Sequence, residues 1–97
     1  MTFTKTSICA LALSAALAGQ AMAAEPDSCK TVNFSDVGWT DITATTATTT
    51  TVLDALGYET DIKLLSVPVT YTSLKKGDID VFLGNWMPTM EADIAKS

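Results

Sequence analysis

Histidine and arginine are absent from the 97-residue sequence, and cysteine occurs only at Cys9 and Cys29. Without a cluster of histidines and cysteines, the chain lacks the usual ligands of a zinc or redox site. It also lacks the Gly-x-Ser-x-Gly elbow of a hydrolase and the glycine-rich loop that cradles a phosphate. No spacing singles out an acid–base pair among the aspartates Asp36, Asp41, Asp78 and Asp80. We therefore predict that the protein is not an enzyme and uses neither a metal nor another cofactor.

Positive charge is scarce as well, because six lysines face eleven acidic residues and the formal net charge is −5. A chain without a basic patch is a poor partner for nucleic acid or for an anionic membrane surface. We therefore predict no nucleic-acid partner. The acidic balance is compatible with a cationic ligand, although scattered acids are also typical of an ordinary solvated surface.

Residues 1–23 have the features of a secretory signal peptide. Lys5 is their only charge, and an apolar stretch from Ile8 to Gly19 follows it. Ala21-Met22-Ala23 then gives the small-x-small pattern of a signal peptidase site, which predicts cleavage between Ala23 and Ala24. A membrane anchor is the alternative, but a span needs about 20 apolar residues and this run is shorter. We expect the chain to be exported, which leaves Cys29 either free or paired with a cysteine outside this sequence.

The rest of the chain alternates between strand-like and helix-like segments. The patterns predict strands at 31–35, 58–67 and 80–83, and helices at 40–56, at 68–76 and from 88 onward. Thr40 is the predicted cap of the first helix, and Gly57 and Gly77 are predicted helix ends. Seven threonines between positions 43 and 51 oppose the first helix, because β-branched side chains lose rotamer freedom there. A strand or a flexible tract is therefore the alternative for this segment.

This β-α-β-α-β-α order predicts an α/β fold with parallel strands. Each crossover is long enough for a right-handed connection, which favours the strand order second, first, third. Helices would then cover both faces of the sheet, in a three-layer sandwich.

The first and third predicted strands each lead into a loop that carries a tryptophan. These loops are Gly38-Trp39-Thr40-Asp41 and Gly84-Asn85-Trp86-Met87-Pro88. In the predicted order the two strands are neighbours, so both indoles emerge at the edge where open α/β sheets bind ligands. A quaternary ammonium has no N–H to donate and is held by aromatic faces and nearby negative charge.

The loops therefore predict a ligand-binding site for such a cation, formed by Trp39, Asp41 and Trp86. The alternatives are that the tryptophans belong to the core and that Asp41 only stabilises the start of its helix. Tyr58 and Tyr71 are expected to pack, and Met87 and Met90 are expected to be core or loop residues rather than a binding surface.

Three features of the sequence together point to a known family: the signal peptide, both tryptophan loops and the Gly77-Asp78-Ile79-Asp80-Val81 run. In these features the chain resembles substrate-binding proteins of choline and glycine betaine ABC importers. The likeness covers essentially the whole chain and is strongest to periplasmic choline-binding proteins. It implies a protein of the periplasm that captures choline or a related quaternary amine in an aromatic box and delivers it to a membrane permease. Trp39 and Trp86 match box residues, and Asp41 matches an acidic residue near the cation.

The resemblance also carries an expectation about domain organisation, because family members are several times longer. It implies that residues 24–97 are the N-terminal part of lobe 1 of a type II periplasmic binding protein. We therefore expect a truncated chain with about half of the ligand site. The alternative is a fragment without a function of its own.

Overall fold

The computed structural model describes residues 25–97. The predicted signal peptide, residues 1–23, and the predicted cleavage site between Ala23 and Ala24 lie outside the described residues.

The centre of the fold is a sheet of three parallel strands. These strands are β1 (Thr31–Asp36), β2 (Glu59–Leu64) and β3 (Val81–Phe82), in the order β2-β1-β3. Phe34 of β1 is aligned with Ile62 of β2 on one side and with Val81 of β3 on the other. The predicted strand order and parallel direction are therefore confirmed.

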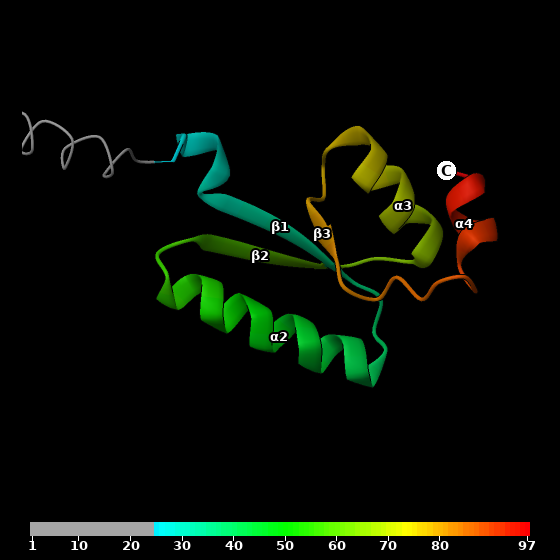
Figure 1. Ribbon diagram of the computed structural model, residues 1–97, viewed down its shortest axis with the longest axis horizontal. Coiled ribbons are helices and arrows are strands. Elements are labelled where there is room, and N and C mark those ends of the chain that lie inside the picture. Colours follow the sequence, from blue (N-terminus) through cyan, green and yellow to red (C-terminus); the bar gives the residue numbers. More distant parts are fainter. Residues whose placement is uncertain (1–24) are drawn as a thin grey trace, which may run out of the picture.

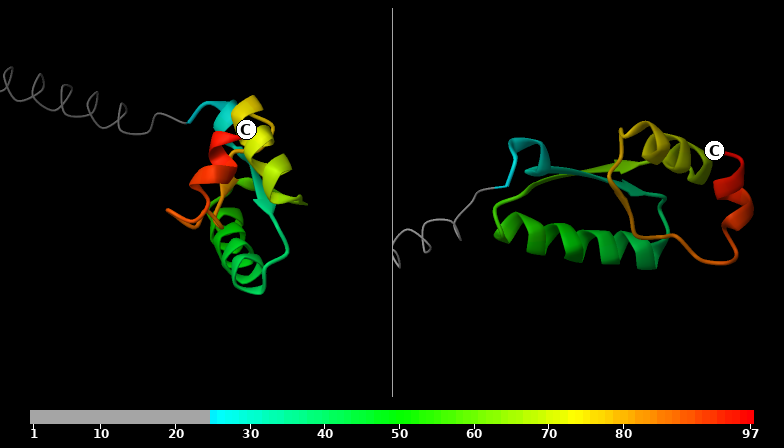
Figure 2. Two further views of the ribbon diagram at one scale, coloured as in Figure 1. Left: turned by 90° about the vertical axis from the view of Figure 1, so that its right-hand side faces the viewer. Right: turned by 45° about the horizontal axis from the view of Figure 1, so that its top comes forward.

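Helices cover both faces of this sheet, as Figure 1 and the right-hand view of Figure 2 show. The helical elements are η1 (Asp27–Cys29), α2 (Thr40–Ala55), α3 (Val67–Lys76) and α4 (Glu91–Ala95). Asp36 of β1 bonds to Thr43 of α2, whereas Ser35 bonds to Thr70 of α3. Consecutive strand residues point to opposite faces, so α2 and α3 must lie on opposite sides of β1. The three-layer α/β prediction is confirmed.

The threonine-rich segment is helical, and its hydroxyls explain how the helix tolerates so many β-branched residues. Five threonine hydroxyls donate to the backbone carbonyl four residues earlier, those of Thr45, Thr48, Thr49, Thr50 and Thr51. Each of these bonds satisfies a hydroxyl within the helix itself. The buried face of α2 is formed by Ile42, Thr46 and Thr50, one turn apart. The alternatives of a strand or a flexible tract are therefore wrong.

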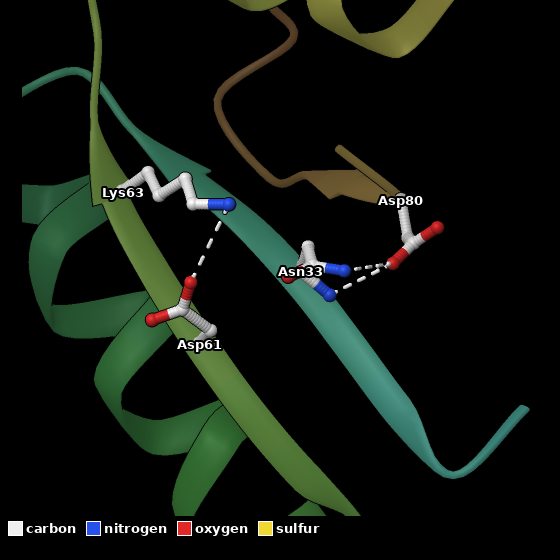
Figure 3. A network of polar contacts seen from close by, with 4 residues as sticks. All are labelled: Asn33, Asp61, Lys63 and Asp80. Carbon is white, nitrogen blue, oxygen red and sulfur yellow. Dashed lines mark hydrogen bonds and ion pairs between the residues drawn. The ribbon is translucent and has the colours of Figure 1, made fainter. Parts of the chain in front are cut away.

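β3 is shorter than the predicted strand at both ends, and at its start the side chain of Asp80 takes part in the contact with β1. The Asp80 backbone N–H still donates to the Asn33 carbonyl at 2.8 Å. Asp80 Oδ2 accepts the backbone N–H of Asn33 at 2.8 Å and the Asn33 side-chain amide at 3.2 Å (Figure 3). A carboxylate thus takes the place of a backbone acceptor next to β1, and regular pairing begins only at Val81. On the outer strand β2, Asp61 and Lys63 form an exposed ion pair at 3.5 Å.

Three other predicted boundaries also differ. The second strand ends at Leu64 rather than at residue 67. The helix α3 begins at Val67, one residue before Pro68, because the Ser66 side chain accepts the Val69 N–H and caps the helix there. The last helix begins at Glu91 rather than at Pro88, because a turn precedes it. This turn is closed by a hydrogen bond from the Met90 N–H to the Trp86 carbonyl. Gly77 ends α3 with a φ of +83°, as predicted.

The core is small and surrounds β1. Its buried apolar residues are Phe34, Ile42, Tyr71, Ile79 and Met90. Tyr71 and Met90 thus pack as predicted, whereas Met87 is exposed. No helix in residues 25–97 combines the length and the apolar character needed to cross a membrane.

Candidate ligand-binding site at the carboxyl edge of the sheet

The loop that carries Trp39 is held by the carboxylate of Asp36, the last residue of β1. Asp36 Oδ1 accepts the backbone N–H of Gly38 at 2.9 Å, and Oδ2 accepts the Thr43 hydroxyl at 2.7 Å. Gly38 has a φ of +85°, a conformation that a side chain disfavours. These contacts turn the chain sharply from β1 into α2 and place Trp39 directly before the helix.

Trp39, rather than Thr40, is the N-cap residue of α2, so the predicted cap is wrong. No side-chain hydrogen bond caps this helix end. The Trp39 carbonyl accepts the Thr43 N–H at 2.8 Å, which is the first bond of the helix. Thr40 is not needed as a cap because Asp36 already holds this turn through Gly38 and Thr43.

Asp41 is exposed in the first turn of α2. Among residues 25–97, its carboxylate forms no hydrogen bond or ion pair, and only its backbone carbonyl has a partner, the Thr45 hydroxyl. A free carboxylate here suits a cation beside Trp39 and also suits the positive end of the helix dipole. Both interpretations of Asp41 therefore remain.

Trp86 lies in the segment after β3 and is held through its backbone. Met90 donates its N–H to the Trp86 carbonyl at 2.8 Å, and Met90 Sδ accepts the Trp86 N–H at 3.3 Å. The preceding residue, Asn85, accepts a 2.6 Å hydrogen bond from the Tyr71 hydroxyl. The indole itself is 56% exposed, compared with 39% for Trp39.

The two tryptophan loops meet at Gly84. A Cβ placed on Gly84 would lie 3.2 Å from Cγ1 of Ile42, which is in the first turn of α2. The start of α2 and the segment leading to Trp86 are therefore in direct contact. Neither indole is sealed in the core, and both follow neighbouring parallel strands at the same edge of the sheet.

The structure brings Trp39 and Trp86 to one edge without stacking them on each other. The aromatic contact found within residues 25–97 joins Tyr71 and Phe82 instead. Three surface depressions lie away from both tryptophans. One, of about 290 Å³, is next to Tyr58 at the opposite edge of the sheet, and two flank α3. In this chain the candidate site is thus an open surface rather than an enclosed box.

Four residues that position the tryptophans were not predicted to do so: Asp36, Tyr71, Asn85 and Met90. For Asp36 a signal was present, because an aspartate two residues before a glycine is typical of a turn closed by its own side chain. For Tyr71 no local signal exists, since it lies 14 residues before Asn85. Within the described residues, no group of three or more histidine, cysteine or acidic side chains is arranged to hold a metal ion.

Residues 30–97 match the family model described as the substrate binding domain of ABC-type glycine betaine transport system. The chain belongs to this family. The match includes all three strands and both tryptophan loops, so the resemblance predicted from those loops is confirmed at the level of the family. Its members are named as binding domains and not as enzymes.

Two solved structures are similar to this member of the family. An ABC-transporter choline binding protein in complex with choline is 85% identical, with a TM-score of 0.71, and the match covers 74% of this chain and 25% of that one. An ABC-transporter choline binding protein in an unliganded semi-closed conformation is 84% identical, with a TM-score of 0.66 and coverage of 72% and 24%. Their parallel α/β architecture agrees with the predicted fold.

A curated relative from Chromohalobacter salexigens, "Uncharacterized protein ORF1", is 50% identical over 86 residues. Those residues are 89% of this chain and 54% of the relative. The chain thus spans about half the length of this relative and about a quarter of each of the two solved proteins.

Proposed function

We propose that the chain is part of the substrate-binding component of an ABC importer, and that it binds choline or a related quaternary amine such as glycine betaine. The observation that carries this proposal is the exposure of Trp39 and Trp86 on loops that leave neighbouring parallel strands at one edge. The 85% identity to a choline binding protein that holds choline supports this class of ligand.

In this proposal each tryptophan offers one aromatic face to the trimethylammonium group. Asp41 adds a negative charge on the Trp39 side, where its carboxylate has no other partner among residues 25–97. The positive charge of the ligand is spread over methyl groups that cannot donate hydrogen bonds, so the aromatic faces replace water as its nearest neighbours. With further aromatic faces supplied by a longer chain, this arrangement would become an aromatic box.

The exposure of the indoles sets the affinity expected of these 97 residues. An exposed cation–π contact contributes about 0.5–1 kcal/mol. Two such contacts and one exposed carboxylate supply less than the roughly 4 kcal/mol that corresponds to a Kd of about 1 mM. We therefore expect the chain alone to bind choline with a Kd in the millimolar range or weaker.

The importer role brings two further proposals. Residues 1–23 direct the chain to the periplasm and are removed between Ala23 and Ala24. In a complete binding protein, the captured amine is then delivered to a membrane permease. Mass spectrometry of the exported chain tests the first proposal, because an N-terminus other than Ala24 would contradict it.

Titration with choline, followed by tryptophan fluorescence, tests the ligand site. We expect a saturable change in emission with choline, and a much weaker one with 3,3-dimethylbutan-1-ol. That alcohol has the shape of choline but no charge, so it separates cation–π binding from apolar contact. Equal responses to the two ligands would contradict the cation site. No response to choline up to about 0.5 M, well above the expected Kd, would mean that these residues do not bind choline by themselves.

Variants of the two tryptophans locate the site, because they are the only tryptophans in the chain and each reports when the other is replaced. We expect Trp39→Leu and Trp86→Leu each to raise the choline Kd about twofold to fivefold, and the matched Trp→Phe variants to raise it less. Leucine preserves apolar bulk and removes the aromatic face, which phenylalanine retains. A choline Kd that is unchanged in both leucine variants would place the site elsewhere. Asp41→Asn is expected to weaken binding about twofold to fivefold, as the loss of one exposed charge would.

A further inference from the structure

Tyr71 is a buried side chain of α3 that makes contact with the Trp86 segment. It is only 6% exposed, and its ring meets the edge of Phe82 of β3 with 5.8 Å between centroids and an angle of 84° between planes. Ser66 caps the start of α3, and Gly77 in the left-handed conformation ends it. Tyr71 therefore projects from a well-capped helix and is packed against the sheet.

The hydroxyl of Tyr71 reaches the residue directly before Trp86. It donates a 2.6 Å hydrogen bond to Asn85 Oδ1, and its oxygen lies 3.6 Å from Met90 Sδ. Burial, and to a lesser extent the negative charge of Asp93, raises the pKa of the Tyr71 phenol. The hydroxyl therefore keeps its proton at neutral pH and remains a hydrogen-bond donor.

Met90 extends this contact to the backbone of Trp86. Met90 is 5% exposed, its N–H bonds to the Trp86 carbonyl, and its sulfur accepts the Trp86 N–H. Both backbone polar groups of Trp86 are thus held by one buried residue, which Tyr71 touches. Trp86 is mostly exposed, so its backbone contacts, rather than core packing, fix the point from which the indole extends.

We infer that Tyr71 is a positioning residue, which acts through Asn85 and Met90 to hold Trp86 ready for a cationic ligand at the carboxyl edge of the sheet. This inference rests on the proposed function, because it gives Trp86 a ligand to meet. Ordering an aromatic side chain before binding reduces the entropy that binding itself must overcome. Tyr71 thus raises affinity without touching the ligand.

The variant Tyr71→Phe tests this role, because it removes the hydroxyl and keeps the ring that packs on Phe82. In a Trp39→Phe background, Trp86 is the only tryptophan, and its time-resolved fluorescence anisotropy reports its local motion. Without any ligand, we expect faster local motion of Trp86 when Tyr71 is replaced by Phe. In the chain with both tryptophans, we expect the choline Kd to rise about twofold, which is no more than the change expected when the Trp86 face is lost altogether.

Tyr58→Phe is the matched control, because Tyr58 also donates a hydrogen bond, of 2.7 Å to Glu25, far from both tryptophans. Asn85→Ala is expected to reproduce the effect of Tyr71→Phe, and the double variant to add nothing further. Asn85→Asp keeps an acceptor oxygen and is expected to keep Trp86 ordered.

Two results would overturn the inference. One is Trp86 motion that is the same in Tyr71→Phe as in Tyr58→Phe. The other is an increase in Trp86 motion in the Tyr71→Phe, Asn85→Ala double variant that equals the sum of the two single increases. The anisotropy measurement needs no ligand. A parent chain that failed to bind choline would therefore count against the proposed function and leave the role of Tyr71 to be decided by the motion of Trp86.

Discussion

The two tryptophan loops leave neighbouring strands at the same edge of the sheet, but they are held in different ways. The Trp39 loop is held by Asp36, whose partners Gly38 and Thr43 lie two and seven residues later in the chain. The Trp86 loop is held locally by Met90, four residues later, and also by the hydrogen bond from Tyr71 of α3 to Asn85. The Trp39 loop is therefore a local structure, whereas the Trp86 loop depends in addition on how α3 packs on the sheet.

This difference has a consequence for ligand binding. The carboxylate of Asp36 makes strong, charge-assisted hydrogen bonds over a short stretch of chain, so Trp39 is placed as soon as β1 and α2 exist. Trp86 is placed only when the core around Tyr71 and Met90 has formed, and its indole is the more exposed of the two. We expect Trp39 to be the more rigid half of the site, and Trp86 to stay ordered only as long as Tyr71 and Met90 hold its segment.

Asp36→Ala is expected to have the largest effect on stability, because it removes two hydrogen bonds to a buried carboxylate. We expect the free energy of unfolding to fall by about 3 kcal/mol. Urea denaturation followed by Trp39 emission, in a Trp86→Phe background, measures this loss. Asp54→Ala is the control, since Asp54 is exposed and its carboxylate accepts one hydrogen bond among residues 25–97, from the Thr60 hydroxyl. Its expected cost is about 0.5 kcal/mol, and equal losses in the two variants would show that Asp36 has no special role.

Gly84→Ala is expected to have an intermediate effect, mainly on the Trp86 side. An added Cβ would lie 2.8 Å from Phe82 Cε2, so the ring on which Tyr71 packs must move. We expect a loss of about 2 kcal/mol, typical of overpacking, with greater motion of Trp86 than of Trp39. Single-tryptophan backgrounds and urea denaturation measure both quantities. Phe82→Leu in the same chain makes room for the methyl group, so the double variant should lose less stability than the two single variants together. A loss equal to or larger than that sum would contradict this explanation.

Collisional quenching by acrylamide is expected to show the smallest difference between the loops. Trp86 alone, in Trp39→Phe, should be quenched more efficiently than Trp39 alone, in Trp86→Phe, because its indole is more exposed. The difference should disappear in concentrated urea, where both indoles are fully solvated. A reversed order in the folded chain would mean that Trp86 is covered in solution.

Much of the fold could be predicted from the sequence because the signals are local. Alternating or short apolar runs followed by turn residues marked the strands, and the crossover lengths then favoured their order and direction. The predicted strand order β2-β1-β3 is observed. The errors at Thr40, Asp80 and Pro88 share a cause, which is that hydrogen bonds not evident from the local pattern set these boundaries. Asp36 holds the turn before α2, the Asp80 side chain bonds to the Asn33 backbone, and a turn closed by the Met90 N–H precedes α4.

The candidate site was predictable in its location but not in its support. Trp39 and Trp86 could be assigned to one edge because parallel strands place their carboxyl ends together. Two features could not be predicted, because both depend on which helix faces lie beside the loops. One is that the Asp41 carboxylate has no partner within residues 25–97, and the other is that Tyr71 reaches Asn85.

Local signals in the sequence were enough to predict the alternation of strands and helices, the parallel sheet and the edge at which both tryptophans emerge. Hydrophobic periodicity and turn residues act over a few positions, so these signals can be recognised without knowledge of the packed fold. The hydrogen bond from Tyr71 to Asn85 and the position of Gly84 against Ile42 followed only from tertiary packing. These two contacts join segments that become neighbours only when α2 and α3 have packed on opposite faces of β1.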